Sequence, residues 1–332
     1  MIKYYLKYEN PLMLPLKIIH KEYIKRKGIY WDYLACEKDA QKASDIIYEE
    51  LCKDKPSMIA RFGSVELNFT VNHIGVVGKH NIIDYIKGIT PQFWYNKLGI
   101  SQLKTNAGFF PLTREYLKQY AELVISDSNY IDILGSWRLE ERFLVDETKI
   151  NAIHLPLLEP FHCTDPWTKY LKGKRVLVVH PFAETIKSQY KKRKVLFNNP
   201  HILPDFELQV IKSVQSIGGN SDYQTWFDAL EWMKNLIDKQ DYDVCLIGCG
   251  AYGLHLAAHV KRNGKKAIHL GGALQLLFGI KGNRWENPQY GVARWGIEEG
   301  FYKNLLNNAS WVRPSNEETP TNSKSVEHSC YW

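Results

Sequence analysis

The sequence has no run of about 20 apolar residues, which is the length that a membrane-spanning helix needs. Its start lacks the continuous apolar core and the small-residue cleavage site of a secretory signal. None of the six cysteines forms a C-x-x-C pair, so no zinc knuckle is expected. From these absences we expect a cytoplasmic protein with reduced thiols.

Familiar catalytic signatures are absent as well. The eleven histidines show no H-E-x-x-H or comparable metal spacing. No G-x-S-x-G elbow, Walker loop or kinase signature occurs. Basic residues are not grouped into a recognised nucleic-acid module, so we expect no nucleic-acid partner.

What the sequence does contain is a globular composition with a mild basic excess and many aromatic residues. An apolar share of 45% and a charged share of 24% are typical of a protein that buries a core. The formal charge of +7 suits an anionic partner such as a nucleotide diphosphate or a membrane surface, although solubility alone can explain it. The 10 Trp and 20 Tyr residues fit stacking on carbohydrate or nucleobases, or a large aromatic core.

Residues 1–27 form a basic segment interleaved with Leu and Ile. Seven Lys and Arg residues stand against two Glu residues, a local charge of +5. Such a segment can rest on an anionic leaflet, which would place the protein at the inner face of the membrane. The alternative is an N-terminal helix that packs on the domain, with Pro11 and Pro15 interrupting any long helix. We treat residues 1–37 as a basic N-terminal extension.

From residue 38 onward, strand-like and helix-like runs alternate. The predicted strands are 57–61, 130–134, 152–158, 175–180, 207–214, 243–247 and 267–270; the predicted helices are 39–53, 64 onward, 183–191, 224–239 and 254–261. This alternation predicts an α/β fold: a Rossmann-like, mostly parallel sheet with helices on both faces. We place this domain at 38–312. The tail at 313–332 is rich in Pro, Glu, Ser and Thr, a composition typical of disorder.

Ligands on such sheets bind outside the carboxyl ends of the strands, so the loops that follow strands are the first candidates. In the first loop, Arg61 follows a strand, Gly63 permits a tight turn and Ser64 is a suitable N-cap. Glu66 then falls in the first helical turn, where the helix dipole stabilises a carboxylate. The same pattern also describes an ordinary capped helix.

The second loop matches G-x-G-x-x-G between a strand and a helix, with Gly248, Gly250, Tyr252 and Gly253 as its candidate ligand-binding residues. Glycines there let backbone amides approach a phosphate. A nicotinamide or flavin site also needs an acidic residue after the next strand, and residues 267–275 contain none. A diphosphate-binding turn and simple helix–strand packing both remain open.

The third loop runs from His269 to Trp285 and combines glycine pairs with cations. Gly271, Gly272 and Asn283 lie in it, Arg284 is suited to phosphate oxygens, and Trp285 to stacking on a base or sugar ring. His180, which ends another predicted strand, is either a general base or a hydrogen-bonded structural residue.

The segment Ile59-Ala-Arg-Phe-Gly-Ser-Val-Glu-Leu67 resembles the R-F-G-x-x-E-L signature of GT-D-type and GT-D-like glycosyltransferases. The resemblance covers roughly residues 38–332, and its further matches are 135–137, 166–167, 173–182, 245–285, 311–314 and 330–332. It implies a Rossmann-like domain, a nucleotide-sugar donor, and a role in building a surface glycan such as capsule, O-antigen or glycoprotein. The acceptor would be a glycan, a lipid-linked sugar or a protein.

The resemblance also implies roles for single residues. In that family the first loop carries an Asp-x-Glu motif that helps to bind a divalent metal and the donor. Here Glu66 matches the motif's Glu, but Ser64 replaces its acid, so Mn²⁺ or Mg²⁺ should bind more weakly. Arg61, Arg284 and the glycine-turn amides would then meet the diphosphate charge. Glu66 and His180 are the candidate general bases, and the tail, which ends in Cys-Tyr-Trp, is expected to dock on the domain.

Two other readings stay open. A methyltransferase using the Gly248 turn would lack the acidic residue expected after the following strand. A non-catalytic nucleotide- or glycan-binding module remains possible because Ser64 replaces the acid. The sequence does not specify the donor sugar, the base, the acceptor, the stereochemical outcome or the oligomeric state.

Overall fold

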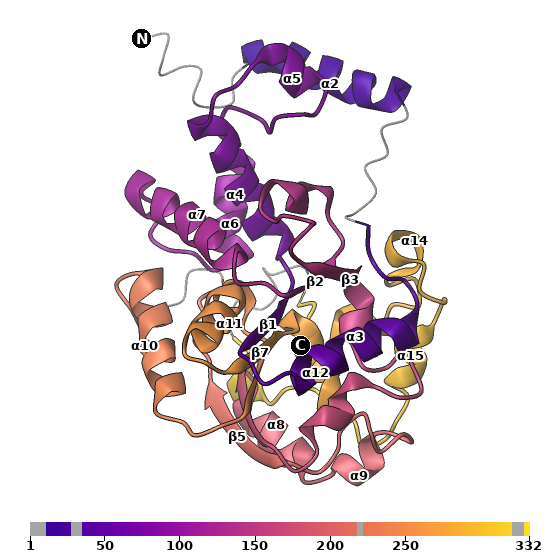
Figure 1. Cartoon of the computed structure of the whole chain (residues 1–332). Helices are drawn as coiled ribbons and strands as arrows, with labels where there is room; N and C mark the ends of the chain where they lie inside the picture. Colours follow the sequence, from indigo (N-terminus) through magenta and orange to yellow (C-terminus); the bar gives the residue numbers. More distant parts are fainter. Residues whose placement is uncertain (1–10, 28–34, 218–221, 321–328) are drawn as a thin grey trace.

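The protein is described here by a computed structural model that covers residues 11–27, 35–217, 222–320 and 329–332 (Figure 1). A seven-stranded sheet with the order β3-β2-β1-β7-β6-β4-β5 lies at its centre, and every strand pairing is parallel. The strands are β1 (Ser57–Ala60), β2 (Ile133–Ser136), β3 (Asn151–His154), β4 (Arg175–His180), β5 (Glu207–Lys212), β6 (Val244–Ile247) and β7 (Lys266–His269). The predicted α/β fold with a parallel sheet is confirmed.

The sheet is buried on both faces, which explains why its strands read as continuous apolar runs. Along β4, Val176 and Val178 belong to one core cluster, whereas Leu177 and Val179 belong to the other. Side chains alternate between the two faces of a strand, so each face receives every second residue.

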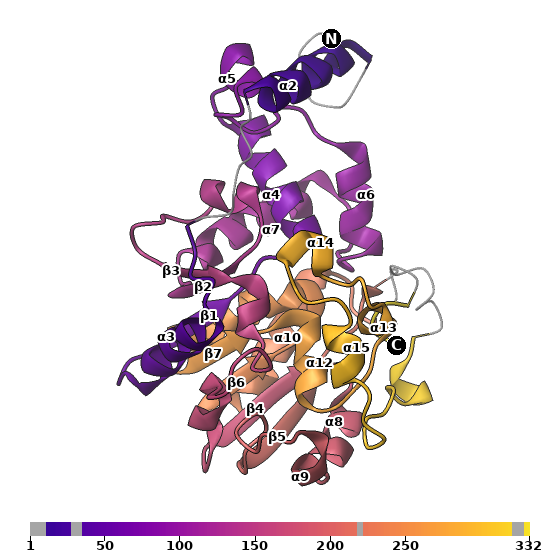
Figure 2. The ribbon, with the colours of Figure 1, turned by 90° about the vertical axis from the view of Figure 1, so that its right-hand side faces the viewer.

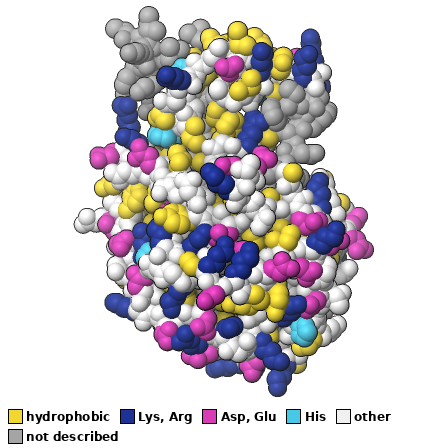
Figure 3. Space-filling model, viewed as in Figure 1, with side chains coloured by type: hydrophobic (Ala, Val, Ile, Leu, Met, Phe, Trp, Pro, Cys, Tyr) yellow, Lys and Arg dark blue, Asp and Glu magenta, His cyan; other side chains and the backbone are white. Residues whose placement is uncertain are grey.

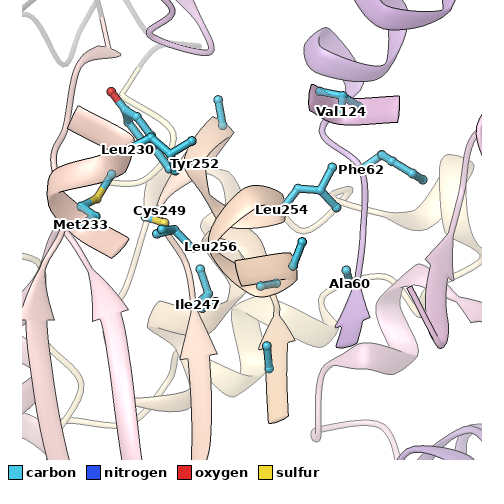
Figure 4. Close-up of a cluster of buried hydrophobic side chains, with 14 of the residues drawn as sticks. Ala60, Phe62, Val124, Leu230, Met233, Ile247, Cys249, Tyr252, Leu254 and Leu256 are labelled. Carbon is cyan, nitrogen blue, oxygen red and sulfur yellow. The ribbon is translucent and has the colours of Figure 1, made fainter. Parts of the chain in front are cut away.

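Helices cover both faces (Figure 2). One core is closed by α4 (Ser64–Val77), α6 (Lys97–Thr105), α7 (Arg114–Ser128), α10 (Trp226–Asp238) and α11 (Gly253–Arg262). Figure 4 shows part of this core, where Ile247 and Cys249 meet Leu254 and Leu256 of α11. The other core is closed by α3 (Ala40–Cys52), η4 (Trp167–Leu171), α8 (Ala183–Tyr190), α9 (Arg193–Leu196), α12 (Leu274–Leu277), α13 (Asn283–Glu286) and α15 (Phe301–Leu305).

Some predicted boundaries are wrong at their ends. The predicted strand 152–158 continues after β3 as the 3₁₀ helix η3 (Leu155–Leu158), whose first turn contains Pro156. Proline has no N–H to donate to a strand ladder. Ser64 is the first residue of α4 rather than its N-cap; Gly63 holds the N-cap position and has no side chain to make a cap bond.

The N-terminal elements form a separate small core at the end of the molecule drawn at the top of Figure 1. There η1 (Pro11–Met13) and α2 (Leu14–Arg26) pack on α5 (Ile82–Ile86) around Met13, Tyr85, Phe93 and Trp94. The Nδ1 atom of His20 lies 2.8 Å from the carbonyl oxygen of Tyr85. The rest of the predicted extension, residues 1–10 and 28–34, lies outside the described residues.

The tail residues 313–320 and 329–332 pack on the domain, although their composition alone predicts disorder. Trp332 is buried in the sheet core, and its Nε1 donates to the carbonyl oxygen of Glu318 at 3.4 Å. The Glu318 carboxylate is buried and accepts hydrogen bonds from the backbone of Glu184 and from the hydroxyl of Thr185. Two buried tail side chains thus anchor a polar segment. The average composition of the tail does not predict this, because it does not depend on where single residues pack.

Over the described ranges, no helix is long and apolar enough to cross a membrane. All six cysteines lie in these ranges and are free thiols.

Candidate functional site

A cavity of about 560 Å³ lies at the carboxyl end of the sheet. The strands and the loops after them contribute Arg61 (β1), Trp137 (β2), His180 (β4), Ser213 (β5), Gly248 (β6) and Gly271 (β7) to its lining. The carboxyl edge is where open α/β sheets bind ligands. The volume falls within the range of about 300–1,000 Å³ typical of small-molecule sites.

The loop after β1 contributes Arg61, Gly63, Ser64 and Glu66 to this lining, so the four candidates predicted there come together. A side-chain carbon added at Gly63 would lie 2.1 Å from Oε2 of Glu66. Glycine at this position therefore allows the Glu66 carboxylate to fold against the start of α4.

Three arginines from different parts of the chain line the cavity: Arg61, Arg284 and Arg294. The guanidinium carbon of Arg61 lies 5.3 Å from the ring centroid of Trp137, and that of Arg284 lies 4.3 Å from the ring centroid of Tyr331. Stacking on a ring orients the plane of the guanidinium group, whose N–H groups match phosphate oxygens. Glu66 is the one acidic side chain among the described lining residues, so the lining carries an excess of positive charge.

Trp137 is held in place by the backbone and by a buried acid. Its Nε1 donates to the carbonyl oxygen of Phe62 at 3.1 Å, which ties the loop after β2 to the loop after β1. Its backbone N–H donates to Glu141, which also accepts from the hydroxyl of Ser136 at 2.6 Å. Burial raises the pKa of Glu141 to about 7, although these hydrogen bonds and the charge of Arg61 act in the opposite direction. The ring that Arg61 stacks on is therefore rigidly placed.

In the glycine turn after β6, two glycines are required for close packing and one faces open space. A carbon added at Gly248 would lie 2.7 Å from Cδ2 of His180, and one at Gly253 would lie 2.1 Å from Cε1 of His269. Both positions thus serve close packing, and Gly253 does not line the cavity. Gly250 has a φ of +58°, is exposed, and has open space where a side chain would be. Of the three predicted phosphate glycines, Gly250 alone has this open geometry.

Only some of the residues predicted in the third loop line the cavity. Gly271 and Gly272 both line the cavity: Gly271 lies next to Arg61, and a carbon added at Gly272 would lie 2.2 Å from the ring of Tyr331. The Asn283 side chain donates to the carbonyl oxygen of Ser329 at 3.1 Å, so it holds the tail. Trp285 lies in the sheet core and lines no part of the cavity. The structure therefore does not bring Trp285 to the cavity wall, where the sequence predicts that it stacks on a ligand.

His180 is buried and bound to the backbone. Its Nδ1 accepts a hydrogen bond from the N–H of Phe182 at 3.0 Å, so the neutral ring carries its hydrogen on Nε2. Burial lowers the pKa of His180 to about 3. The residue therefore suits a hydrogen-bond donor at the cavity wall and not the general base that its position in the sequence suggests.

The more buried part of the cavity is formed by side chains from helices. Tyr252 stacks on Trp226 with ring centroids 4.7 Å apart, and its hydroxyl lies 2.8 Å from that of Ser216. Tyr120 of α7 and His255 of α11 line this part and are almost fully buried. Because Trp226 and Ser216 hold the ring and the hydroxyl of Tyr252, we assign Tyr252 a structural role in the cavity lining.

The sequence analysis does not predict several lining residues: Tyr120, Ser216, His255, Arg294, Trp295 and Tyr331. Tyr120 and His255 occupy apolar helix faces, where a core role is the ordinary expectation. Arg294 and Trp295 stand between Gly291 and Gly296, and this glycine-flanked pair of a cation and an aromatic residue is the one signal that the sequence offers.

For a divalent cation, the described lining of the cavity offers one carboxylate, that of Glu66. In the part of the chain that the structure describes, no group of three or more His, Cys, Asp or Glu side chains is placed to hold a metal ion. Mg²⁺ sites in proteins use one or two carboxylates together with substrate phosphates and waters, so Glu66 would hold such an ion only together with the phosphates of a bound ligand.

Comparisons of the chain with protein-family models, with curated proteins and with solved structures gave no match. The functional assignment therefore depends on the chemistry of the site.

Proposed function

We propose that this protein is a glycosyltransferase that moves a sugar from a nucleotide-sugar donor to an acceptor hydroxyl in surface-glycan biosynthesis. The observation that carries the proposal is the convergence of Arg61, Arg284 and Arg294 on one cavity at the carboxyl edge of a parallel sheet. Three guanidinium groups with one carboxylate suit the diphosphate of such a donor. The GT-D-like R-F-G-x-x-E segment forms one wall of the same cavity.

In this proposal the arginines and the exposed backbone at Gly250 bind the diphosphate. Trp137, Trp295 and Tyr331 supply aromatic surface for the base or for a sugar ring. His180 donates through Nε2 at the wall. Since the arginines are already oriented by ring stacking, they would meet the charge that develops on the leaving group with little reorganisation.

We propose a direct displacement at the anomeric carbon of the donor. The acceptor oxygen forms a bond to the anomeric carbon as the bond from that carbon to the phosphate oxygen breaks. The electron pair of the broken bond leaves with the nucleoside diphosphate, and the acceptor's proton passes to the Glu66 carboxylate. Positioning and electrostatic stabilisation of the leaving group supply the rate enhancement.

Substitution of Glu66 tests this assignment. We expect Glu66→Gln to retain donor binding and to lose about 10²- to 10⁴-fold in the rate of transfer, the usual contribution of a general base. The matched control is Glu122→Gln, whose carboxylate lies on the exposed side of α7. Full transfer by Glu66→Gln would remove Glu66 from the mechanism.

A thermal-shift screen against UDP-, GDP-, dTDP- and CMP-sugars, with and without Mn²⁺, tests the function as a whole. We expect one class of nucleotide to raise the melting temperature, because a ligand that binds the folded state stabilises it. We expect the same shift without Mn²⁺, since arginines take the place of the metal. A folded sample that responds to none of the donors would contradict the proposal, and donor binding without sugar transfer would favour a non-catalytic binding module.

We also propose that the α2 end of the molecule contacts the inner face of a membrane. Leu14, Ile18 and Ile19 of α2 are 57%, 59% and 48% exposed. Ile82 and Ile83 of α5 are exposed on the helix that packs against α2. Figure 3 shows apolar side chains gathered at this end of the molecule, with lysines and arginines beside them. Apolar groups next to basic ones favour an anionic leaflet, where lipid-linked acceptors are found.

A further inference from the structure

Two polar atoms in the buried part of the cavity have no hydrogen-bond partner among the described residues: the hydroxyl oxygen of Tyr120 and Nε2 of His255. Both residues line the cavity, and their side chains are 0% and 1% exposed. A buried polar group without a partner costs about 1–3 kcal/mol, so native proteins satisfy nearly all of them. Two such atoms in one part of a cavity point to a ligand that supplies the missing partners.

The second ring nitrogen of His255 is firmly held. Its Nδ1 lies 2.7 Å from Oδ2 of Asp127, and the other oxygen of Asp127 accepts from Arg262 at 2.5 Å. Because a carboxylate only accepts, Nδ1 carries a hydrogen, and in the tautomer protonated at Nδ1 alone Nε2 presents a lone pair. The ring is packed edge-on between Tyr120 and Trp226, with centroids 5.7 Å and 5.3 Å away. Its orientation is therefore set before any ligand arrives.

The hydroxyl of Tyr120 complements this acceptor. Burial raises the pKa of Tyr120 well above its usual value, with a smaller contribution from the charge of Glu66, so the group remains a neutral O–H donor. The buried part of the cavity thus offers one donor and one acceptor. A ligand hydroxyl, which both accepts and donates, satisfies such a pair.

We propose that Tyr120 and His255 form a subsite for the hydroxyl groups of the donor's sugar, distinct from the arginines that bind its diphosphate. This inference rests on the proposed function and deepens it. Glu66, Tyr120 and His255 all line the same cavity. The phenol and the imidazole thus contact the sugar, and the arginines bind the diphosphate.

The test separates the sugar from the nucleotide. Wild type, Tyr120→Phe and His255→Gln are titrated with UDP and UDP-glucose, and with GDP and GDP-mannose, by calorimetry. For the pair that binds, we expect Tyr120→Phe to raise the Kd of the sugar nucleotide by about 3- to 10-fold, the value of one hydrogen bond, and to leave the Kd of the nucleoside diphosphate unchanged. The matched control is Tyr116→Phe, which removes a phenol oxygen from the same helix outside the cavity.

The stability of the ligand-free variants is the second readout. Tyr120→Phe removes an oxygen that has no partner, so we expect its melting temperature to equal or exceed that of the wild type. A clear loss of stability would overturn the inference, because it would mean that the hydroxyl serves the fold. An unchanged Kd for the sugar nucleotide in Tyr120→Phe would overturn the subsite alone. No binding of any probe to the wild type would overturn the proposed function and the donor subsite together.

Discussion

The guanidinium carbon of Arg294 lies 4.3 Å from the ring centroid of Trp137. Arg294 belongs to the short helix α14 (Val292–Trp295), whereas Trp137 follows β2, so the contact joins distant parts of the chain. The same indole ring also carries Arg61 at 5.3 Å. One rigid tryptophan thus gathers two cations at the cavity, and this pairing makes the site suitable for a diphosphate.

Removal of Arg294 should weaken nucleotide binding. We expect Arg294→Gln to raise the Kd of the nucleoside diphosphate by about 10- to 100-fold, since hydrogen bonds to charged groups contribute about 1.5–3 kcal/mol. The salt dependence of binding should also become shallower, because fewer charges take part. Calorimetric titration at two ionic strengths measures both effects. Arg114→Gln, on the exposed start of α7, is the control, and equal affinity of Arg294→Gln and wild type would contradict the assignment.

The tail should contribute substantially to stability. Trp332 is buried in the sheet core, so Trp332→Ala should lower the free energy of unfolding by about 3–5 kcal/mol, as for other large buried aromatic residues. Urea denaturation measures the change, and Glu317→Ala, at an exposed position of the tail, is the control. If removal of the tail by limited proteolysis left stability and activity intact, docking would have no role.

The buried histidines predict a loss of stability in acid. Burial lowers the pKa of His180 and of His269 to about 3, whereas histidine in an unfolded chain titrates near about 6.5. At a pH between the folded and the unfolded pKa, the two histidines bind protons in the unfolded chain but stay neutral in the folded protein. The free energy of unfolding should therefore fall as the pH drops below about 6.5, by about 1.4 kcal/mol per pH unit for each such histidine.

Substitution of His180 isolates its share of this effect. An asparagine oxygen can accept the N–H of Phe182 in place of Nδ1, and it does not titrate. We expect His180→Asn to lose less stability than the wild type between pH 7 and pH 5 in urea titrations. The largely exposed His201 provides the control as His201→Asn. Parallel pH profiles for wild type and His180→Asn would show that His180 carries no such linkage.

Membrane contact predicts selective binding to anionic vesicles. Phosphatidylglycerol-containing vesicles should sediment the protein, and pure phosphatidylcholine vesicles should not. The double variant Ile18→Ser, Ile19→Ser should bind several-fold more weakly, because each lost apolar side chain removes burial energy. Leu98→Ser, at a similarly exposed position on α6, is the control. Equal sedimentation of the double variant and the wild type would place the contact elsewhere.

Strands and their following loops could be predicted where local sequence dominates. The apolar, β-branched run from Arg175 to His180 is observed as β4 with the predicted bounds. The predicted strand 130–134 begins too early, since β2 begins at Ile133. Asp132, just before β2, bonds to Met58 of β1 through its backbone and its side chain, and this partner is invisible in the sequence.

The site could be predicted in part. Arg61, Gly63, Ser64 and Glu66 line the cavity as expected, because the short loop after β1 and the first turn of α4 carry them all. Trp285 is predicted to stack on a base or sugar ring, yet adjacent residues on a helical turn point in different directions, and its ring turns into the core. Arg284 contacts both rings, with its guanidinium carbon 5.5 Å from the centroid of Trp285 and 4.3 Å from that of Tyr331, and Tyr331 comes from the tail.

The sequence by itself determined the parallel α/β sheet and the edge of that sheet where a ligand would bind. Both follow from short-range patterns: buried strands alternating with helices, and glycines directly after strands. Only the tertiary structure decided which side chains share the cavity. Arg294 reaches Trp137, Tyr331 covers Gly272, and Asp127 orients His255 through long-range packing, and such contacts depend on the folded positions of elements that are far apart in the chain.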